Sequence, residues 1–110
     1  MATNYLTLGQ VNPTSNTATT LYTVPSLTQA VVSTITICNA ASATSTYRIA
    51  VRKAGETLSQ KQYIAYDSTV LGNDTIGLTL GVSLGAGDIL TIYASSASVS
   101  FNAFGSEVTA

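Results

Sequence analysis

The stretch Asp74–Leu84, DTIGLTLGVSL, alternates aliphatic residues with small or polar ones along its whole length. The aliphatic positions are Ile76, Leu78, Leu80, Val82 and Leu84. A period of two predicts a β-strand with one buried face, because a helix would scatter these side chains around its axis. Gly77 and Gly81 fall on the opposite face, and glycines inside a strand predict that another group approaches the backbone closely there.

The same alternation predicts further short strands on both sides of this segment. In Val31–Asn39 we expect Val31, Ile35 and Ile37 to face inward. In Ser45–Lys53 the inward residues would be Tyr47, Ile49 and Val51, with Arg48, Ala50 and Arg52 outward. Other expected strands are Asp88–Ser95, Ser98–Gly105 with Val99, Phe101 and Ala103 on one side, the weaker Leu21–Val24 and Gln62–Tyr66, and an N-terminal edge strand at Tyr5–Val11.

Turn residues separate these strands, and no segment has a helical period. Ser96 and Ala97 fill a short gap between the last two strands, which predicts a hairpin there. The fold class is therefore all-β, a two-layer antiparallel β-sandwich of about seven or eight short strands, with jelly-roll and immunoglobulin-like arrangements both compatible. We expect a single β-sandwich domain at residues 18–110, preceded at 1–17 by an N-terminal arm or edge strand, or by a frayed terminus.

The charge content excludes several functions. The chain has four Lys and Arg residues and five Asp and Glu residues. Charged residues thus make up 8% of the chain, against roughly 25% in ordinary domains. So few cations predict no nucleic-acid partner. The chain has no histidine and a single cysteine, Cys38, so we expect no enzyme, no cofactor and no metal site. No apolar run is long enough for a membrane span, and no secretory signal is visible.

The carboxylates are expected at turns or strand ends, and none on the inward face of a strong strand: Glu56, Asp67, Asp74, Asp88 and Glu107. Oxygens of Asn73–Asp74 and Gly87–Asp88 would suit calcium, but the spacing of a calcium loop is missing. Tyr63 and Tyr66 are three residues apart and so should not share a strand face. Depletion of charge is typical of buried interfaces, which predicts that much of the surface is covered in an oligomer or a larger assembly. The candidate interface residues are Tyr5, Leu6, Tyr22, Tyr63, Tyr66 and Asp67.

The segment Ala18–Asn39, ATTLYTVPSLTQAVVSTITICN, carries the pattern L-Y-T-V-P-S followed by V-V-S-T-I-T-I-C-N. With Tyr47–Arg52, Tyr63–Asp67, Asn73–Ile76 and Ser100–Gly105, it resembles small structural proteins of tailed bacteriophages, particularly those infecting cyanobacteria. The resemblance implies a virion component made in the host cytoplasm. It would be either a capsid decoration (cement) protein or a small tail-associated protein.

The resemblance favours a non-enzymatic cement protein on the capsid exterior. Such proteins sit as oligomers, often trimers, on the major capsid protein and stabilise the shell against internal DNA pressure. The partners it implies are thus the major capsid protein and further copies of the chain, without nucleic acid or membrane. The alternative is a tail, baseplate or fibre module that binds host glycan or another tail protein, with Tyr63, Tyr66, Asp67 and Asn73 clustered outward at one loop end.

Overall fold

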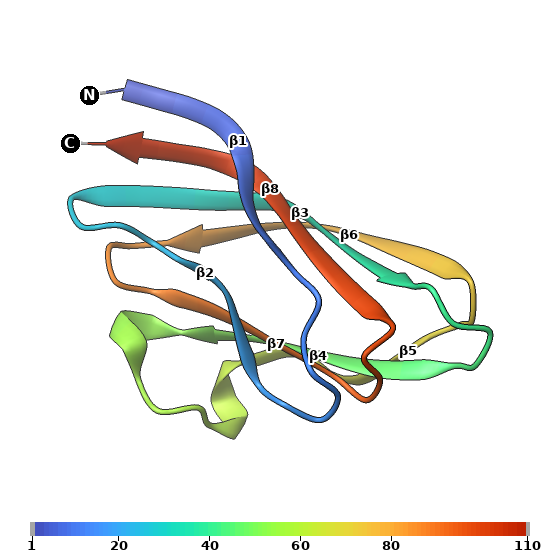
Figure 1. Cartoon of the computed structure of the whole chain (residues 1–110). Helices are drawn as coiled ribbons and strands as arrows, with labels where there is room; N and C mark the ends of the chain where they lie inside the picture. Colours follow the sequence, from blue (N-terminus) through green and yellow to red (C-terminus); the bar gives the residue numbers. More distant parts are fainter. Residues whose placement is uncertain (1, 110) are drawn as a thin grey trace.

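The computed structural model describes residues 2–109, which form two packed antiparallel sheets of four strands each (Figure 1). The predicted all-β sandwich is therefore confirmed. The strands are β1 (Ala2–Val11), β2 (Thr19–Thr23), β3 (Thr28–Asn39), β4 (Ser45–Arg52), β5 (Tyr63–Val70), β6 (Asp74–Leu84), β7 (Ile89–Ala94) and β8 (Val99–Thr109). Two single 3₁₀ turns, η1 (Lys53–Gly55) and η2 (Gln60–Gln62), lie in the connection between β4 and β5.

The strand order identifies the sandwich as a jelly roll. Sheet 1 has the order β1-β8-β3-β6 and sheet 2 the order β2-β7-β4-β5. The first strand pairs with the eighth, the second with the seventh, the third with the sixth and the fourth with the fifth. The chain is thus one long hairpin of paired strands, rolled up so that successive pairs alternate between the sheets. Of the two arrangements that the sequence allowed, the immunoglobulin-like one is excluded.

The predicted hairpin between the last two strands is wrong. β7 belongs to sheet 2 and β8 to sheet 1, so the residues between them carry the chain across the sandwich. This crossing is held by backbone hydrogen bonds: the Ser95 N–H donates to the Thr46 carbonyl, and the Ala40 N–H donates to the Ser98 carbonyl. A short gap fits both kinds of connection, because its length does not fix the partner of either strand.

The core lies between the inward faces of the two sheets. Ile35 and Ile37 of β3 and Tyr47 and Ile49 of β4 are buried as the alternation predicts. The Phe101 ring meets the Tyr47 ring edge-on, with centroids 6.4 Å apart, and so joins the sheets at their centre. The other large, fully buried side chains are aliphatic, apart from Asn39: Leu90, Ile92, Val24, Val32, Val70 and Val99.

Two inward positions predicted in sheet 1 are wrong because of a β-bulge. Leu80 and Gly81 of β6 together oppose Ser33 of β3, and Ser33 in turn has no direct partner on β8. On β3 the extra residue reverses the alternation, so Val32 is buried in place of Val31. On β6 Leu80 lies in the bulge itself and is 42% exposed, whereas Val82 and Leu84 beyond it keep the inward face that the alternation predicts.

The close backbone approach predicted at Gly77 and Gly81 is also wrong. A Cβ atom added to either would have no neighbour within 4 Å, and Gly81 instead supplies a positive φ of 103° inside the bulge. Close approaches occur at other glycines: Gly9 against the Leu21 carbonyl, Gly72 against the Ser42 carbonyl and Gly105 against the Val31 carbonyl. The strand pattern does not contain this information, since these contacts join distant segments.

The N-terminal strand is the edge of sheet 1 and pairs with β8 from Ala2 opposite Thr109 to Val11 opposite Phe101. The division of the chain into an arm at 1–17 and a domain at 18–110 stays a prediction; Met1 and Ala110 lie outside the described residues. None of the helical turns in residues 2–109 has the length and apolarity of a membrane span.

Candidate interaction surfaces

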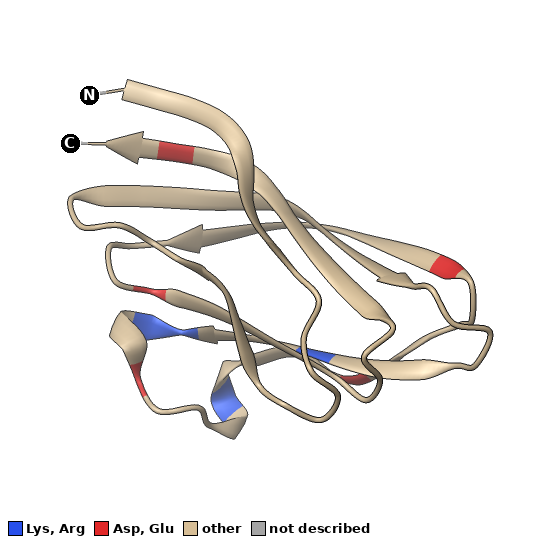
Figure 2. Ribbon diagram, in the orientation of Figure 1, with Lys and Arg blue, Asp and Glu red and all other residues tan. Residues whose placement is uncertain are grey.

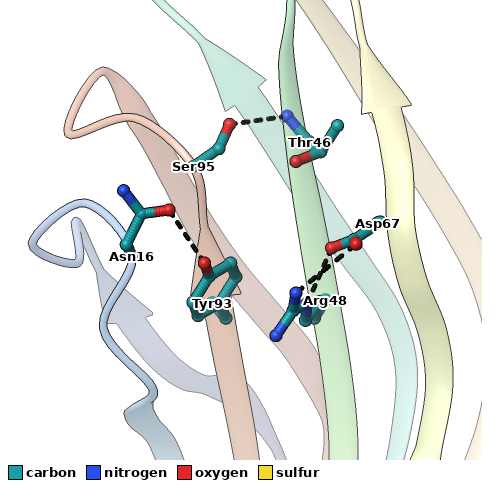
Figure 3. A network of polar contacts seen from close by, with 6 residues as sticks. All are labelled: Asn16, Thr46, Arg48, Asp67, Tyr93 and Ser95. Carbon is teal, nitrogen blue, oxygen red and sulfur yellow. Dashed lines mark hydrogen bonds and ion pairs between the residues drawn. The ribbon is translucent and has the colours of Figure 1, made fainter.

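The outer face of sheet 2 carries a compact group of charged and aromatic side chains around Arg48. Tyr47 and Ile49 point into the core, so Arg48 between them points outward. Its guanidinium carbon lies 4.3 Å from the centroid of the Tyr66 ring and 4.2 Å from that of Tyr93, which places the cation between two aromatic rings. Arg48 Nε also donates to Asp67 Oδ1 at 2.6 Å, as Figure 3 shows.

Further contacts extend this group on both sides. The rings of Tyr63 and Tyr66 meet edge to face with centroids 4.9 Å apart. On the other side the Tyr93 hydroxyl donates to Asn16 Oδ1 at 2.8 Å (Figure 3). We call these residues the arginine–tyrosine cluster: Asn16, Arg48, Tyr63, Tyr66, Asp67 and Tyr93. Hydrogen bonds join Arg48 to Asp67 and Tyr93 to Asn16, and these contacts hold the centre of the cluster together.

The structure corrects the expectation that Tyr63 and Tyr66 lie on opposite faces. Ile64 has no direct partner on β4, and Tyr66 and Asp67 together oppose Arg48, so two irregularities interrupt the alternation of β5. Asp67 has a φ of 49°, in the left-handed region. Both tyrosines therefore face outward, and the second irregularity brings Tyr66 and Asp67 to the same arginine.

Arg48, Tyr93 and Asn16 were not among the site residues predicted from the sequence. The outward position of Arg48 followed from the alternation, but its neighbours depend on strand pairing. Tyr93 lies directly opposite Arg48 because β4 pairs with β7. Asn16 reaches the same face through the loop between β1 and β2, where its N–H donates to the Ala94 carbonyl. Asn73, which the alternative function grouped with these tyrosines, instead donates its N–H to the Ala41 carbonyl at a loop between the sheets.

The ion pair between Arg48 and Asp67 is partly exposed, with 23% and 45% of the two side chains accessible. The hydrogen bond to Asp67 holds the pKa of Arg48 above its ordinary value. Exposed pairs of this kind are weakened by solvent screening. A double-mutant cycle with Arg48→Ala and Asp67→Ala should therefore give a coupling energy of only about 0.2–1 kcal/mol by urea denaturation. A coupling of several kcal/mol would mean that the pair is a main support of the fold.

Tyr22 is not a surface residue, contrary to the sequence-based prediction. It is 8% exposed, and its hydroxyl donates to the carboxylate of Glu107, which joins β2 of sheet 2 to β8 of sheet 1. Burial raises the pKa of Tyr22, and the hydrogen bond and negative charge of Glu107 raise it further. The expectation that no carboxylate faces inward is therefore wrong for Glu107. The expectation that every carboxylate lies at a turn or a strand end is wrong for Asp67, which lies inside β5.

The outer face of sheet 1 is a second candidate surface, uncharged where the first is charged. Tyr5 is 86% exposed there, and with Val31 and Phe104 it lines a shallow depression beside the bulge. Leu6 borders the same depression, but its side chain lies on the other face of β1 and is also exposed. The four strands of this sheet hold only two charged residues, Asp74 and Glu107, and no Lys or Arg (Figure 2). All four cations lie on β4 or in the connection that follows it, at Arg48, Arg52, Lys53 and Lys61.

The remaining carboxylates do not gather into a metal centre within residues 2–109, where no three His, Cys, Asp or Glu side chains are grouped. Asp88 instead closes a turn: its two oxygens accept hydrogen bonds from the N–H groups of Ala54 and Gly85, each at 2.8 Å. The Asp88 oxygens considered for calcium thus bind backbone N–H groups, and they connect η1 to the turn before β7.

Comparison with known proteins gives a likeness in fold. No protein-family model matches the chain, and no curated protein matches it. A chain in the structure of infectious bursal disease virus, Gx strain, is similar over 96% of this chain, with a TM-score of 0.52 and 12% identity. A pentameric capsid protein isolated from metagenomic phage sequences aligns over 94%, with a TM-score of 0.38 and 22% identity. This chain spans 31% and 61% of the lengths of those two proteins. At 12% identity, the similarity to the chain of infectious bursal disease virus concerns the fold alone, an all-β domain of the same general architecture.

Proposed function

We propose that the protein is a non-enzymatic structural component of a phage virion, and that it acts as a cement protein on the exterior of the capsid. In this role several copies bind the shell of major capsid protein and stabilise it against the pressure of packaged DNA. The observation that carries the proposal is an outer sheet face without cations on a jelly-roll domain. That architecture is common in viral capsid domains.

The charge distribution supports a role in assembly rather than in free solution. A free domain of this size usually keeps about 25–35% of its surface residues charged, whereas this chain has 8% in all. The deficit is concentrated on sheet 1, where exposed Tyr5, Val31 and Phe104 surround an uncharged depression. Depletion of charge with retention of aromatic residues is the composition of an interface core. Contacts of modest strength suffice for such a role, because many copies act together on one shell.

The copy number in purified virions tests the proposal. Quantitative peptide mass spectrometry against the major capsid protein should find on the order of hundreds of copies per particle if the chain reinforces the shell. The major tail protein serves as an internal control for the count. Absence of the chain from the particle would contradict a virion role.

A lower count would favour the alternative, a tail, baseplate or fibre module that binds host glycan or another tail protein. The arginine–tyrosine cluster is the surface that supports this alternative, since jelly rolls also serve as lectin domains and Tyr66 exposes its ring. The charged groups beside that ring, Arg48 and Asp67, are paired with each other, which makes them less able to recognise a sugar. We therefore place the shell role first.

A further inference from the structure

The four edge strands of the sandwich differ in how their backbone groups are protected from pairing with another strand. An edge strand has a row of unpaired N–H and C=O groups, and proteins protect it with charge, proline, bulges or short length. In sheet 2, β2 has only five residues and is followed by Pro25, and β5 is interrupted twice and carries Asp67. In sheet 1, β6 begins with Asp74 and is broken by the bulge at Leu80.

The remaining edge strand, β1, has none of this protection over most of its length. Its ten residues, ATNYLTLGQV, include no charged residue and no proline. Its one irregularity falls at Leu8, which leaves Ala2–Thr7 as an uninterrupted run paired only with β8. A run of this kind is the usual site at which a further strand is added to a sheet.

Both faces of this run are also uncovered. Every residue from Ala2 to Thr7 is exposed, and consecutive residues of a strand face opposite sides. The second sheet therefore does not cover the inner side here, and Tyr5 on one face and Leu6 on the other both remain accessible to solvent. A strand added beside β1 would cover backbone groups and side chains together.

We propose that β1 is a self-pairing edge: Ala2–Thr7 of one copy pairs antiparallel with the same segment of a second copy, so that the two copies of sheet 1 form one continuous eight-stranded sheet. The occupant is a second copy of this chain because the segment has no charge, so two antiparallel copies set no like charges against each other. The inference rests on the proposed function, in which several copies bind one shell. The pairing is β1 with β1 because the other edges are protected. Such a contact is isologous and closes with two-fold symmetry.

Matched pairs of lysine substitutions on the two edges of sheet 1 test the inference. Thr3 and Thr7 on β1 and Thr75 and Thr79 on β6 are exposed threonines with the same spacing. In an antiparallel β1 pair with the two Tyr5 residues opposite each other at the two-fold axis, Thr3 of one copy lies opposite Thr7 of the other. T3K/T7K then sets like charges against each other and should raise the dimer dissociation constant at least tenfold, in order of magnitude. T75K/T79K should leave it unchanged. Sedimentation velocity over a dilution series of the purified full chain measures the constant.

The result is independent of the virion count, so the two proposals can fail separately. A wild-type chain that is monomeric throughout the dilution series, or an oligomer of odd number, would overturn self-pairing. An equal loss of affinity in T75K/T79K would do the same.

Amide hydrogen exchange of the wild-type chain keeps the test decisive if T3K/T7K does not fold. Alternate amides in Ala2–Thr7 should exchange more slowly at high protein concentration than at low, because pairing adds hydrogen bonds along the free side of β1. Amides of the β6 edge give the internal control. Exchange in Ala2–Thr7 that is independent of concentration would refute the pairing.

Discussion

Replacing Phe101 by alanine is expected to lower the free energy of unfolding by about 3–5 kcal/mol. The ring is fully buried and packs edge-on against Tyr47 of the opposite sheet, so its removal leaves a cavity at the centre of the sandwich. A domain of this size is stable by about 5–15 kcal/mol, and the loss is therefore a large part of the total. Urea denaturation followed by tyrosine fluorescence measures it.

Phe104 provides the matched control on the same strand. It lies three residues further along β8, is 37% exposed and borders the depression on the outer face of sheet 1. Phe104→Ala should cost less than about 1 kcal/mol, since the site is open to solvent and no closed cavity forms. Equal losses for the two phenylalanines would contradict the assignment of inward and outward faces on β8.

Gly105→Ala is expected to have the second large effect, a decrease in the midpoint of thermal unfolding of at least about 10 °C. A Cβ atom at this position would fall well inside van der Waals contact with the Val31 carbonyl oxygen of the neighbouring strand. Backbone atoms cannot move aside as a flexible side chain can, so β3 and β8 would have to separate. We expect a cost of about 3 kcal/mol, at the upper end of that for overpacking. Differential scanning calorimetry measures the midpoint.

Gly77→Ala is the corresponding control in the edge strand of the same sheet. A Cβ atom there would have no neighbour within 4 Å, and Gly77 is not among the residues with positive φ. The substitution should be neutral or stabilise the protein by about 0.4–1 kcal/mol, because alanine restricts the unfolded chain. A lower midpoint for Gly77→Ala than for Gly105→Ala would show that the close approach is misplaced.

The two candidate surfaces, on the outer faces of sheet 2 and sheet 1, differ in charge. The arginine–tyrosine cluster is charged and lies on the outer face of sheet 2, across β7, β4 and the edge strand β5. The depression at Tyr5 and Phe104 is apolar and lies next to the unprotected β1 edge. A chain that pairs through β1 would extend the outer face of sheet 1 across two copies and leave sheet 2 exposed on each.

The sequence by itself determined the fold class and part of the core. Alternation in Ser45–Arg52 and Val99–Ala103 identified Tyr47, Ile49 and Phe101 as buried, because burial of one strand face is a local pattern with a period of two. The low charge content also followed directly from composition. These properties need no knowledge of which strand lies beside which.

Only the tertiary structure decided the strand order, the bulges and the composition of the arginine–tyrosine cluster. A bulge depends on how two distant strands are aligned, so neither the exchange of Val31 for Val32 nor the exposure of Leu80 could be read from the alternation. The same non-local pairing set Tyr93 beside Arg48 and moved Tyr63 to the face of Tyr66. Local pattern fixes which side of a strand is apolar, whereas pairing between distant segments fixes which side chains meet.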